Sequence, residues 1–524
     1  MPDARTGAYL TQPLHRLIRE LPNAIATVDR GRRRTWAQVG DRIARLAGLL
    51  IDAGLRPGDR VALLAQNSDL YLDYMLGVWW AGGVLNPVNI RWTVDEIAFS
   101  LTDCTTSILI VDDHFSPMIP ALRAAAPTLR LILTTGPAAP ECVDYESALA
   151  AATPVTDRVR NGEDLAAILY TGGTTGRPKG VMLTHRALTA SAMSHAGSGE
   201  CAPGACMMHT APLFHVGAMA GVIAALLRRS RHVFVPAFEP EAVMGAIQHN
   251  GVTDVFLVPT MIQALLDHPR FPDHDLSSIE RLIYAASPIS PALLDRTVAA
   301  MPRAGFVQAY GMTETSAIVT LLGPSDHDPA AYASGRVRSV GRATMSAELR
   351  IAAPDGCDMP PGEAGEILVR GESVMTGYWN RPQETADALQ AGWMHTGDLG
   401  RMDEAGYLYI MDRLKDMILT GGENVYSAEV EAALASHPSV QQCAVVARPD
   451  ERWGEVVHAV LVIRPGHALD PQALTAHCRQ SIAGYKCPRS FEQRTVMPLS
   501  AAGKILKATL RDDARRLESG SSSH

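Results

Sequence analysis

Short apolar runs recur along most of the chain, and each run ends in small, polar or turn residues. Helical patterns separate one run from the next. The clearest runs are RVALLAQN (60–67), TSILIVDD (106–113), DLAAILYTGG (164–173), TDVFLVPT (253–260) and RLIYAAS (281–287). Strands that alternate with helices favour parallel sheets covered on both faces. The predicted fold class is therefore α/β, with ligands expected at the carboxyl ends of the strands.

The ends of two helices can be predicted from their capping residues. Thr35 is a suitable N-cap, apolar residues follow it at helical spacing, and Gly54 can end that helix. Asp470 is a second candidate N-cap, with Pro471 in the first turn. Both patterns predict helices that begin directly after the capping residue.

The chain is too long for one hydrophobic core, so its 524 residues predict at least two domains. The pattern changes around residues 407–418, and a compact mixture of helices and strands follows. We predict a small α+β domain of about a hundred residues there. The expected boundaries are a large N-terminal domain at 1–411, a hinge at 412–416, a small C-terminal domain at 417–518 and an appended tail at 519–524.

Composition excludes several classes of function. The net charge of −8 argues against nucleic-acid binding. The most apolar segment, Tyr74 to Leu85, is too short to span a bilayer and is better explained as a buried helix. The N-terminus lacks a secretory pattern, so the predicted location is the cytoplasm. Cys201, Cys206, His209 and His215 lack the paired spacing of a zinc site.

The stretch YTGGTTGRPKG, Tyr170 to Gly180, is predicted to bind phosphate. It follows a predicted strand, and its glycines let backbone N–H groups approach an anion without a Cβ in the way. It is not a Walker P-loop, because Lys179 follows Pro178 and Gly180 stands in the Ser/Thr position.

This stretch resembles the signature of the AMP-forming, adenylate-forming enzymes. Further motifs of that family follow in the family order: QAYGMTET (308–315), HTGDLG (395–400), DRLKDMILTGGENVYSAEVE (412–431) and PLSAAGKILKATLR (498–511). The resemblance covers nearly the whole chain. It implies a large domain of doubly wound sheets plus a small distorted β-barrel, followed by a small mobile α+β domain.

The resemblance also implies a nucleotide site. The phosphate loop would hold the β- and γ-phosphates, Tyr310 would stack on adenine, and Asp398 with Arg413 would bind ribose. Gly172 departs from the serine usual in the family. The implied nucleotide-binding residues are Thr171, Gly172, Gly173, Thr174, Thr175, Gly176, Lys179, Ala286, Ser287, Pro288, Tyr310, Gly311, Asp398 and Arg413.

Catalytic roles follow from the same resemblance. Thr313 would bind the α-phosphate, Glu314 would hold Mg²⁺, and Lys504 would bridge the substrate carboxylate and the α-phosphate. Lys504 lies in the small domain, so the reaction requires domain closure. His215 would gate the acyl pocket. The residues implied for the hinge and the coenzyme A tunnel are Lys415, Gly421, Gly422 and Trp453.

The family reaction converts a carboxylic acid and ATP to acyl-AMP, and then transfers the acyl group to a thiol, usually that of coenzyme A. The acyl pocket would be formed by His215, Gly217, Val258, Ala309 and Gly311. Glycine at 311, where acetate-specific relatives have tryptophan, is interpreted as leaving a deep slot. Residues 213–219 contain no carboxylate that could anchor an amino group.

We therefore expect an apolar acid, either a medium- or long-chain fatty acid or an aromatic acid such as a hydroxycinnamate. The expected small molecules are that acid, ATP, Mg²⁺ and coenzyme A. A carrier-protein thiol as acceptor and a non-catalytic binding protein are the alternatives. Oligomeric state stays open, a homodimer included.

Overall fold

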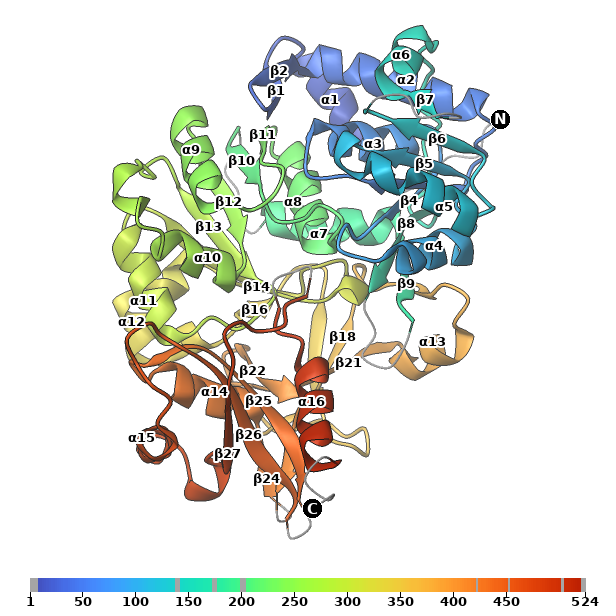
Figure 1. The fold of residues 1–524 in the computed structure, drawn as a ribbon. Coiled ribbons are helices and arrows are strands. Elements are labelled where there is room, and N and C mark those ends of the chain that lie inside the picture. The colour runs from blue at the N-terminus through green and yellow to red at the C-terminus, as the bar shows by residue number, and fades with distance from the viewer. Residues whose placement is uncertain are drawn as a thin grey trace.

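The computed structural model describes residues 8–136, 142–171, 177–197, 204–420, 423–450, 453–500 and 504–519. The chain forms a large N-terminal part and a smaller C-terminal part that ends in helix α16 (Lys507–Ser519). Figure 1 shows the smaller part, in orange and red, below the rest of the molecule. Four sheets organise the two parts.

The first sheet is mostly parallel and has eight strands. In spatial order these are β19 (Gly377–Tyr378), β9 (Lys179–Thr184), β8 (Leu165–Thr171), β4 (Val84–Pro87), β3 (Arg60–Leu64), β5 (Ile108–Val111), β6 (Leu131–Thr134) and β7 (Val143–Asp144). Alternate residues of β3 enter different cores: Val61 and Leu63 face one, Ala62 and Leu64 the other. Burial on both faces explains why this strand is apolar throughout.

The second sheet has nine strands. In spatial order these are β16 (Arg342–Ala343), β15 (Thr320–Leu322), β14 (Gly305–Tyr310), β13 (Arg281–Ala285), β12 (Asp254–Leu257), β10 (Cys206–His209), β11 (Arg231–Phe234), β1 (Ile25–Asp29) and β2 (Arg32–Thr35). Its central strands β14, β13, β12, β10 and β11 are parallel. The predicted α/β class is confirmed.

The helices of the large part follow its strands as predicted. They are α1 (Gln12–Glu20), α2 (Trp36–Asp52), α3 (Asp69–Trp80), α4 (Val94–Asp103), α5 (Ile119–Ala125), α6 (Tyr145–Ala151), α7 (His185–Gly197), α8 (Val216–Leu227), α9 (Pro240–Asn250), α10 (Pro259–Leu266), α11 (Pro291–Ala300), α12 (Pro329–Ala333) and α13 (Pro382–Ala388). Thr35 caps α2 through a capping box with Gln38, and Gly54 follows the helix at φ +85°, as predicted. The apolar segment from Tyr74 is the buried helix α3, which ends at Trp80 before β4.

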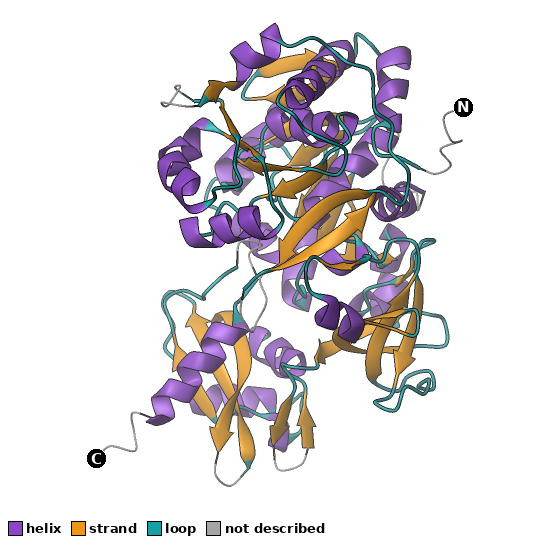
Figure 2. Cartoon of the chain, turned by 90° about the vertical axis from the view of Figure 1, so that its right-hand side faces the viewer, coloured by secondary structure: helices purple, strands orange, loops and turns teal. Residues whose placement is uncertain are grey.

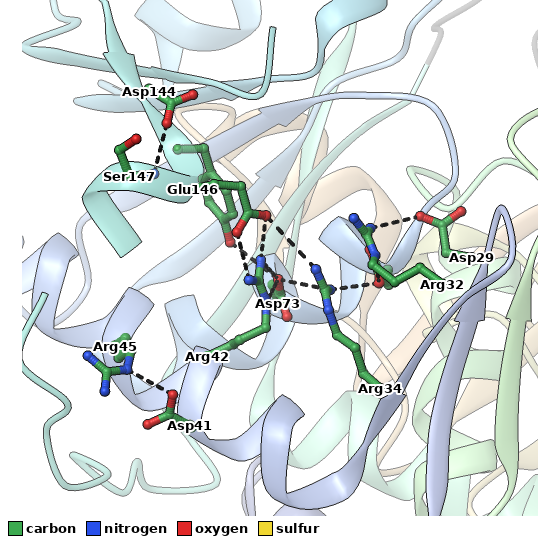
Figure 3. Close-up of polar contacts among 12 residues, drawn as sticks. Asp29, Arg32, Arg34, Asp41, Arg42, Arg45, Asp73, Asp144, Glu146 and Ser147 are labelled. Atoms are coloured by element: carbon green, nitrogen blue, oxygen red, sulfur yellow. Dashed lines mark hydrogen bonds and ion pairs between the residues drawn. The ribbon is translucent and has the colours of Figure 1, made fainter. Parts of the chain in front are cut away.

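An ion-pair network stabilises the packing of β2, α2, α3 and α6 (Figure 3). Arg34 pairs with Asp69 at 2.6 Å and with Asp73 at 3.7 Å. Arg42 pairs with Asp73 and with Glu146, both at 2.8 Å. Asp69 and Asp73 lie one turn apart on α3 and are buried, so the arginines compensate two charges that water does not reach.

The third sheet lies where the resemblance predicted a distorted β-barrel. It is antiparallel and consists of β17 (Glu348–Ala352), β18 (Gly365–Arg370), β21 (Trp393–Met402), β20 (Leu389–Gln390) and β22 (Leu408–Arg413). The pairing of the described strands follows an open path, so this element is a curled sheet.

The smaller part contains the fourth sheet: β24 (Glu423–Val425), β23 (Ile418–Thr420), β26 (Gly454–Ile463), β25 (Val440–Asp450) and β27 (Ser490–Gln493). Helices α14 (Ser427–Ala435) and α15 (Pro471–Cys478) pack on one face, and α16 covers the other (Figure 2). Asp470 caps α15, as predicted. Arg413 to Met417 form the turn between β22 and β23, at the predicted hinge.

No helix among the described residues is both long enough and apolar enough to cross a bilayer.

Candidate functional site

Several predicted segments meet where the parallel strands of the second sheet have their carboxyl ends. Leu257, Tyr284 and Gln308 lie side by side on β12, β13 and β14. Because these strands are parallel, the residues that follow them meet at one edge. Val258, the segment 286–288 and the segment 309–311 therefore lie along the same edge of the sheet.

The backbone around this edge is strained at three non-glycine residues. Ala286, Ser316 and Ala317 have φ angles of +75°, +55° and +91°. Such conformations cost about 1–3 kcal/mol each and cluster at functional sites. Ala286 was predicted to form a wall of the adenine slot, whereas sequence patterns had not singled out Ser316 and Ala317.

Tyr310, Asp398 and Arg413 form a contiguous polar group. The hydroxyl of Tyr310 donates to Asp398 Oδ2 at 2.8 Å, and Arg413 Nε lies 3.3 Å from Asp398 Oδ1. Asp398 and Arg413 are also paired across β21 and β22. Burial raises the pKa of Asp398, while the charge of Arg413 and the Tyr310 hydrogen bond oppose that rise. The contact keeps an acceptor carboxylate beside the aromatic ring.

Glu314 is buried in the short 3-10 helix η3 (Thr313–Thr315), which Thr313 begins. The hydroxyl of Tyr378 donates to Glu314 Oε1 at 2.9 Å, and the amide of Met375 donates to its backbone carbonyl. Burial raises the pKa of Glu314 above its usual value. The segment around Tyr378 therefore positions this carboxylate, a role that the sequence motifs did not indicate.

The two ends of the predicted phosphate loop are close together, because Thr171 on β8 pairs with Lys179 on β9. The ammonium of Lys179 lies 5.1 Å from the ring centre of Tyr378, and hence near Glu314. Gly172, Gly173, Thr174, Thr175 and Gly176 lie outside the described residues.

Helix α4 contacts both ends of this loop. The hydroxyl of Tyr170 donates to Asp103 Oδ2 at 2.6 Å, and the Tyr170 ring packs edge-on against Phe99 at 6.2 Å. On the other side of the loop, the guanidinium of Arg177 lies 5.2 Å from the ring centre of Phe99. Sequence reasoning missed Phe99 and Asp103, because no local pattern shows which helix packs beside the loop.

Lys504 reaches the site from the small domain. Burial first, and the charge of Arg413 second, lower its pKa to about 8, against the opposing effect of Asp398 and Glu314. The structure thus brings together Lys504, the ribose-site candidates and the metal-site candidate, which are distant in sequence. In Figure 1 the deep red segment before α16 runs to the junction of the two parts.

Two sets of hydrogen bonds fix the backbone at Ser500 and Lys504. Ser500 and Lys504 exchange hydrogen bonds, with Ser500 N–H donating to the Lys504 carbonyl at 2.7 Å and Lys504 N–H donating to Ser500 Oγ at 3.1 Å. Arg91 of the large part donates to the Ser500 carbonyl at 3.0 Å. Arg91 was not among the predicted site residues.

His215 is the N-cap residue of α8 and lies close to Lys504. Burial first, and the charges of Lys504 and Arg91 second, lower the pKa of His215 to about 3. Its Nε2 atom is buried and has no hydrogen-bond partner among the described residues. A neutral imidazole with an unused nitrogen can accept or donate one hydrogen bond to a bound molecule.

The acyl-pocket prediction needs one correction, at Gly311. A Cβ at Gly311 would lie 2.0 Å from the Ala317 carbonyl oxygen, so its missing side chain reflects backbone contact and not a deep slot. The interpretation of this glycine as an open slot in the acyl pocket is therefore wrong. At Gly217 a Cβ would lie 3.7 Å from the nearest atom of the Phe256 ring, which leaves room for a small side chain. Val258 and Ala309 are buried.

Four predicted residues remain, those assigned to the hinge and to the coenzyme A tunnel. Lys415 is in the turn between β22 and β23, and burial lowers its pKa. Trp453 is in the small domain, with the Arg489 guanidinium 4.3 Å from its ring centre. Gly421 and Gly422 lie outside the described residues. The roles assigned to these four residues stay predictions.

Comparison with known proteins adds independent information. Residues 14–379 match the family described as AMP-binding enzyme, and residues 429–504 match the AMP-binding enzyme C-terminal domain. The chain is 40% identical over 501 residues to a feruloyl-CoA synthase of Amycolatopsis sp, covering 95% of this chain and 97% of that protein. It is 35% identical over 497 residues to the fatty acid–[acyl-carrier-protein] ligase ScoC of Streptomyces coeruleorubidus, covering 94% and 93%.

A solved structure is also similar over the full length. The anthranilate CoA ligase AuaEII in complex with anthranoyl-AMP superposes with a TM-score of 0.91 at 26% sequence identity. The superposition covers 99% of this chain and 100% of that one.

Proposed function

This chain belongs to the family of AMP-binding enzymes, and from that premise we propose how its residues act. It is an acyl-CoA synthetase of the adenylate-forming superfamily, using ATP and coenzyme A as substrates. In the first half-reaction the acid carboxylate attacks the α-phosphate of ATP, giving acyl-AMP and pyrophosphate. In the second, the coenzyme A thiol attacks the acyl carbon and AMP leaves.

The polar group of Tyr310, Asp398 and Arg413, with Lys504 near enough to interact with the charges of Asp398, Glu314 and Arg413, is the observation that carries the proposal. Two anions must approach each other in the first half-reaction, so cations and N–H donors matter more than a base. Lys504 would bridge the carboxylate and the α-phosphate, and Thr313 would donate to the α-phosphate. Lys179, at the end of the phosphate loop, would place a positive charge beside the phosphates. Asp398 would accept from the ribose hydroxyls while Tyr310 stacks on adenine, and the charge of Arg413 opposes the rise in the pKa of Asp398.

We propose that Mg²⁺ binds through Glu314. Among the described residues no group of three or more histidine, cysteine or carboxylate side chains could hold a metal ion. A single buried carboxylate fits Mg²⁺, which usually binds proteins through one or two carboxylates and takes its other ligands from substrate phosphates and water. Tyr378 orients this carboxylate, and the ion would supply charge neutralisation to the triphosphate when bound.

We propose that the acid is apolar, with an aromatic acid of the hydroxycinnamate class as the first candidate. Support comes from the likeness to a feruloyl-CoA synthase and from the Phe256 ring beside Gly217. The unused Nε2 of His215 would contact the acid near its carboxylate, because His215 lies close to Lys504. A medium- or long-chain fatty acid is the second candidate, supported by the likeness to a fatty acid ligase.

That same relative supports a second candidate acceptor, the thiol of an acyl-carrier protein. In either case we propose that residues 1–411 bind ATP and the acid, that 412–416 act as the hinge, and that 417–518 carry Lys504. Lys415 would be the pivot. Gly421, Gly422 and Trp453 would face coenzyme A after the small domain rotates. Availability of ATP and coenzyme A suits a cytoplasmic location.

A product assay by mass spectrometry tests the proposal. Purified protein would receive Mg-ATP and an acid panel, from acetate through medium- and long-chain fatty acids to benzoate, coumarate and ferulate. Coenzyme A, an acyl-carrier protein or neither would be added. We expect AMP, pyrophosphate and the thioester of coenzyme A, with ferulate or coumarate preferred. Lys504→Ala should lose about 10²–10³ in acyl-AMP formation, by analogy with oxyanion donors.

Three results would change the proposal. Acyl-AMP that reacts with the carrier protein and not with coenzyme A would select the second acceptor. Preference for fatty acids over aromatic acids would select the second substrate class. An enzyme that forms no AMP with any acid, or that works equally well with EDTA in place of Mg²⁺, would contradict the chemistry or the metal proposal respectively.

A further inference from the structure

We propose that Asp412 and Ser427 form a latch across the hinge, holding the small domain in the position that places Lys504 in the site. The inference rests on the proposed two-step function. It concerns a buried cluster of Asp412, Ser427, Glu431 and Lys507, none of which contributes to the catalytic group described above.

Asp412 binds Ser427 through both carboxylate oxygens. Its Oδ2 accepts the Ser427 backbone N–H, and its Oδ1 accepts the Ser427 hydroxyl at 3.0 Å. The exposed fraction of Asp412 is 6%, and that of Ser427 is 0%. Hydrogen bonds to a charged acceptor away from water are stronger than neutral ones.

Lys507 fixes the direction of the Ser427 hydroxyl. Lys507 Nζ lies 2.6 Å from Ser427 Oγ and 2.7 Å from Glu431 Oε1. An ammonium can only donate, so Ser427 Oγ accepts from Lys507 and its single hydrogen is left for Asp412. Burial alone would lower the pKa of Lys507, but Glu431 and Asp412 outweigh it and raise the pKa. Lys507 therefore stays charged.

The residues of the cluster come from both sides of the turn between β22 and β23. Asp412 is on β22 of the third sheet, whereas Ser427 and Glu431 are on α14 and Lys507 begins α16. Ser427, Glu431 and Lys507 move together when the small domain turns about the hinge. Within this cluster, the two hydrogen bonds to Asp412 are the ones that such a rotation would break, so they act in the closed position alone.

Lys507 also links the latch to the chemistry, because it lies on the same segment as Lys504. One side of that segment is anchored by Arg91, which donates to the Ser500 carbonyl at 3.0 Å. The other side is anchored by Lys507 on Ser427 and Glu431. The latch should therefore favour acyl-AMP formation and oppose the rotation that precedes thioester formation.

Ser427→Pro is the sharpest variant, because proline removes both donors to Asp412. Ser427 is the first residue of α14, a position that proline favours in helices. Tyr426 before it is already extended, at φ −84° and ψ 117°, as a residue before proline must be. Ser427→Ala removes only the hydroxyl bond. Ser436→Ala is the matched control, since that hydroxyl donates within the small domain and does not contact Asp412.

The two half-reactions would be measured separately, by acyl-AMP release without coenzyme A and by consumption of supplied acyl-AMP with it. We expect Ser427→Pro to slow acyl-AMP formation about tenfold, with Ser427→Ala intermediate and thioester formation unchanged or faster. Equal loss in both half-reactions, or no loss in either, would overturn the latch.

A conformational readout separates this inference from the proposed function. Arg413 and Lys415 are exposed, so trypsin cleaves after them once the backbone of this turn unfolds locally, which the Asp412–Ser427 bonds oppose. Ser427→Pro should therefore be cut several-fold faster than the unaltered chain, and Ser436→Ala at the unaltered rate. An enzyme inactive on every acid would sink the proposed function, while this cleavage difference would still support the latch. Unaltered cleavage in Ser427→Pro would reject it.

Discussion

At the scale of single residues, Lys504 shows how position changes chemistry. Its ammonium enters a buried group that contains Arg413, Asp398 and Glu314. Burial and the neighbouring cation weaken its hold on the proton, so its pKa falls to about 8. The charge that the first half-reaction needs is therefore lost within an accessible pH range.

The pH dependence of acyl-AMP formation should report this residue. Below its pKa Lys504 is protonated and active, so kcat/KM should be flat on the acid side of about 8 and fall about tenfold per unit above it. Lys504→Arg, whose charge persists at alkaline pH, should be slower but lack this decline. The measurement is stopped-flow or quenched pyrophosphate release from pH 6.5 to 10. A flat profile up to pH 10 in the unaltered enzyme would contradict it.

Gly311 and Gly217 make a matched pair of substitutions. Gly311→Ala would place a Cβ 2.0 Å from the Ala317 carbonyl, in backbone that is already strained, and should lower the free energy of unfolding by about 1–3 kcal/mol. Gly217→Ala meets Phe256 at 3.7 Å and should keep full stability while discriminating against the bulkier acids. Urea unfolding midpoints and kcat/KM on the acid panel check both. Equal midpoints for the two variants would refute the steric argument.

At the scale of elements, α4 contacts the residues on both sides of the phosphate loop. Asp103 accepts the Tyr170 hydroxyl on one side of the loop, and Phe99 contacts Arg177 on the other. The backbone carbonyl of Asp103 also accepts the indole N–H of Trp379 at 2.9 Å, directly beside Tyr378. One helix end therefore connects the loop with the segment that positions Glu314.

Tyr170→Phe tests this connection with the loss of a single oxygen. The ring contact with Phe99 is retained while the bond to Asp103 is removed, so the fold should persist and the loop should lose one anchor. We expect the KM for ATP to rise about three- to tenfold, the worth of one charge-assisted hydrogen bond, with no change in the thioester half-reaction. Asp103→Asn should behave similarly. A rise in the KM for coenzyme A instead would show that α4 serves another step.

At the scale of the whole molecule, the site exists only in one arrangement of the two parts. Polar contacts that join them include Arg91 with Ser500 and Asp412 with Ser427, and Arg511 of α16 also bonds the turn at Lys415 and Asp416. A bound acyl-adenylate would add contacts with Lys504 on one side and with Asp398 and Tyr310 on the other. Ligand binding should therefore stabilise the closed position by mass action.

A non-hydrolysable acyl-adenylate analogue should protect the hinge from trypsin. At about 100 times its Kd the analogue should slow cleavage after Arg413 and Lys415 by roughly 100-fold, provided that cleavage needs opening. Lys504→Ala should reduce this protection, since it removes the contact that the small domain makes with the ligand. Protection that is identical in Lys504→Ala would show that closure does not depend on that lysine.

Much of the fold was predictable because its signals are local. The apolar run at 60–67 became β3 with both faces buried, Thr35 capped α2, and Asp470 capped α15. Motif order indicated the catalytic candidates, and the structure places Lys504, Asp398, Arg413 and Glu314 in one group. The supporting residues Tyr378, Asp103 and Arg91 were not predictable, because each acts on a segment far away in sequence.

Gly311 shows that a motif alone does not indicate why a particular residue type is required at a position. Sequence suggested a pocket at this glycine, whereas a Cβ placed there would first meet the backbone oxygen of Ala317. The sequence by itself determined the alternation of elements, the helix caps and the candidate chemistry, since these depend on neighbours along the chain. Only the tertiary structure decided which carboxylates meet Lys504, what occupies the space beside Gly311 and which bonds cross the hinge, because those depend on packing between segments hundreds of residues apart.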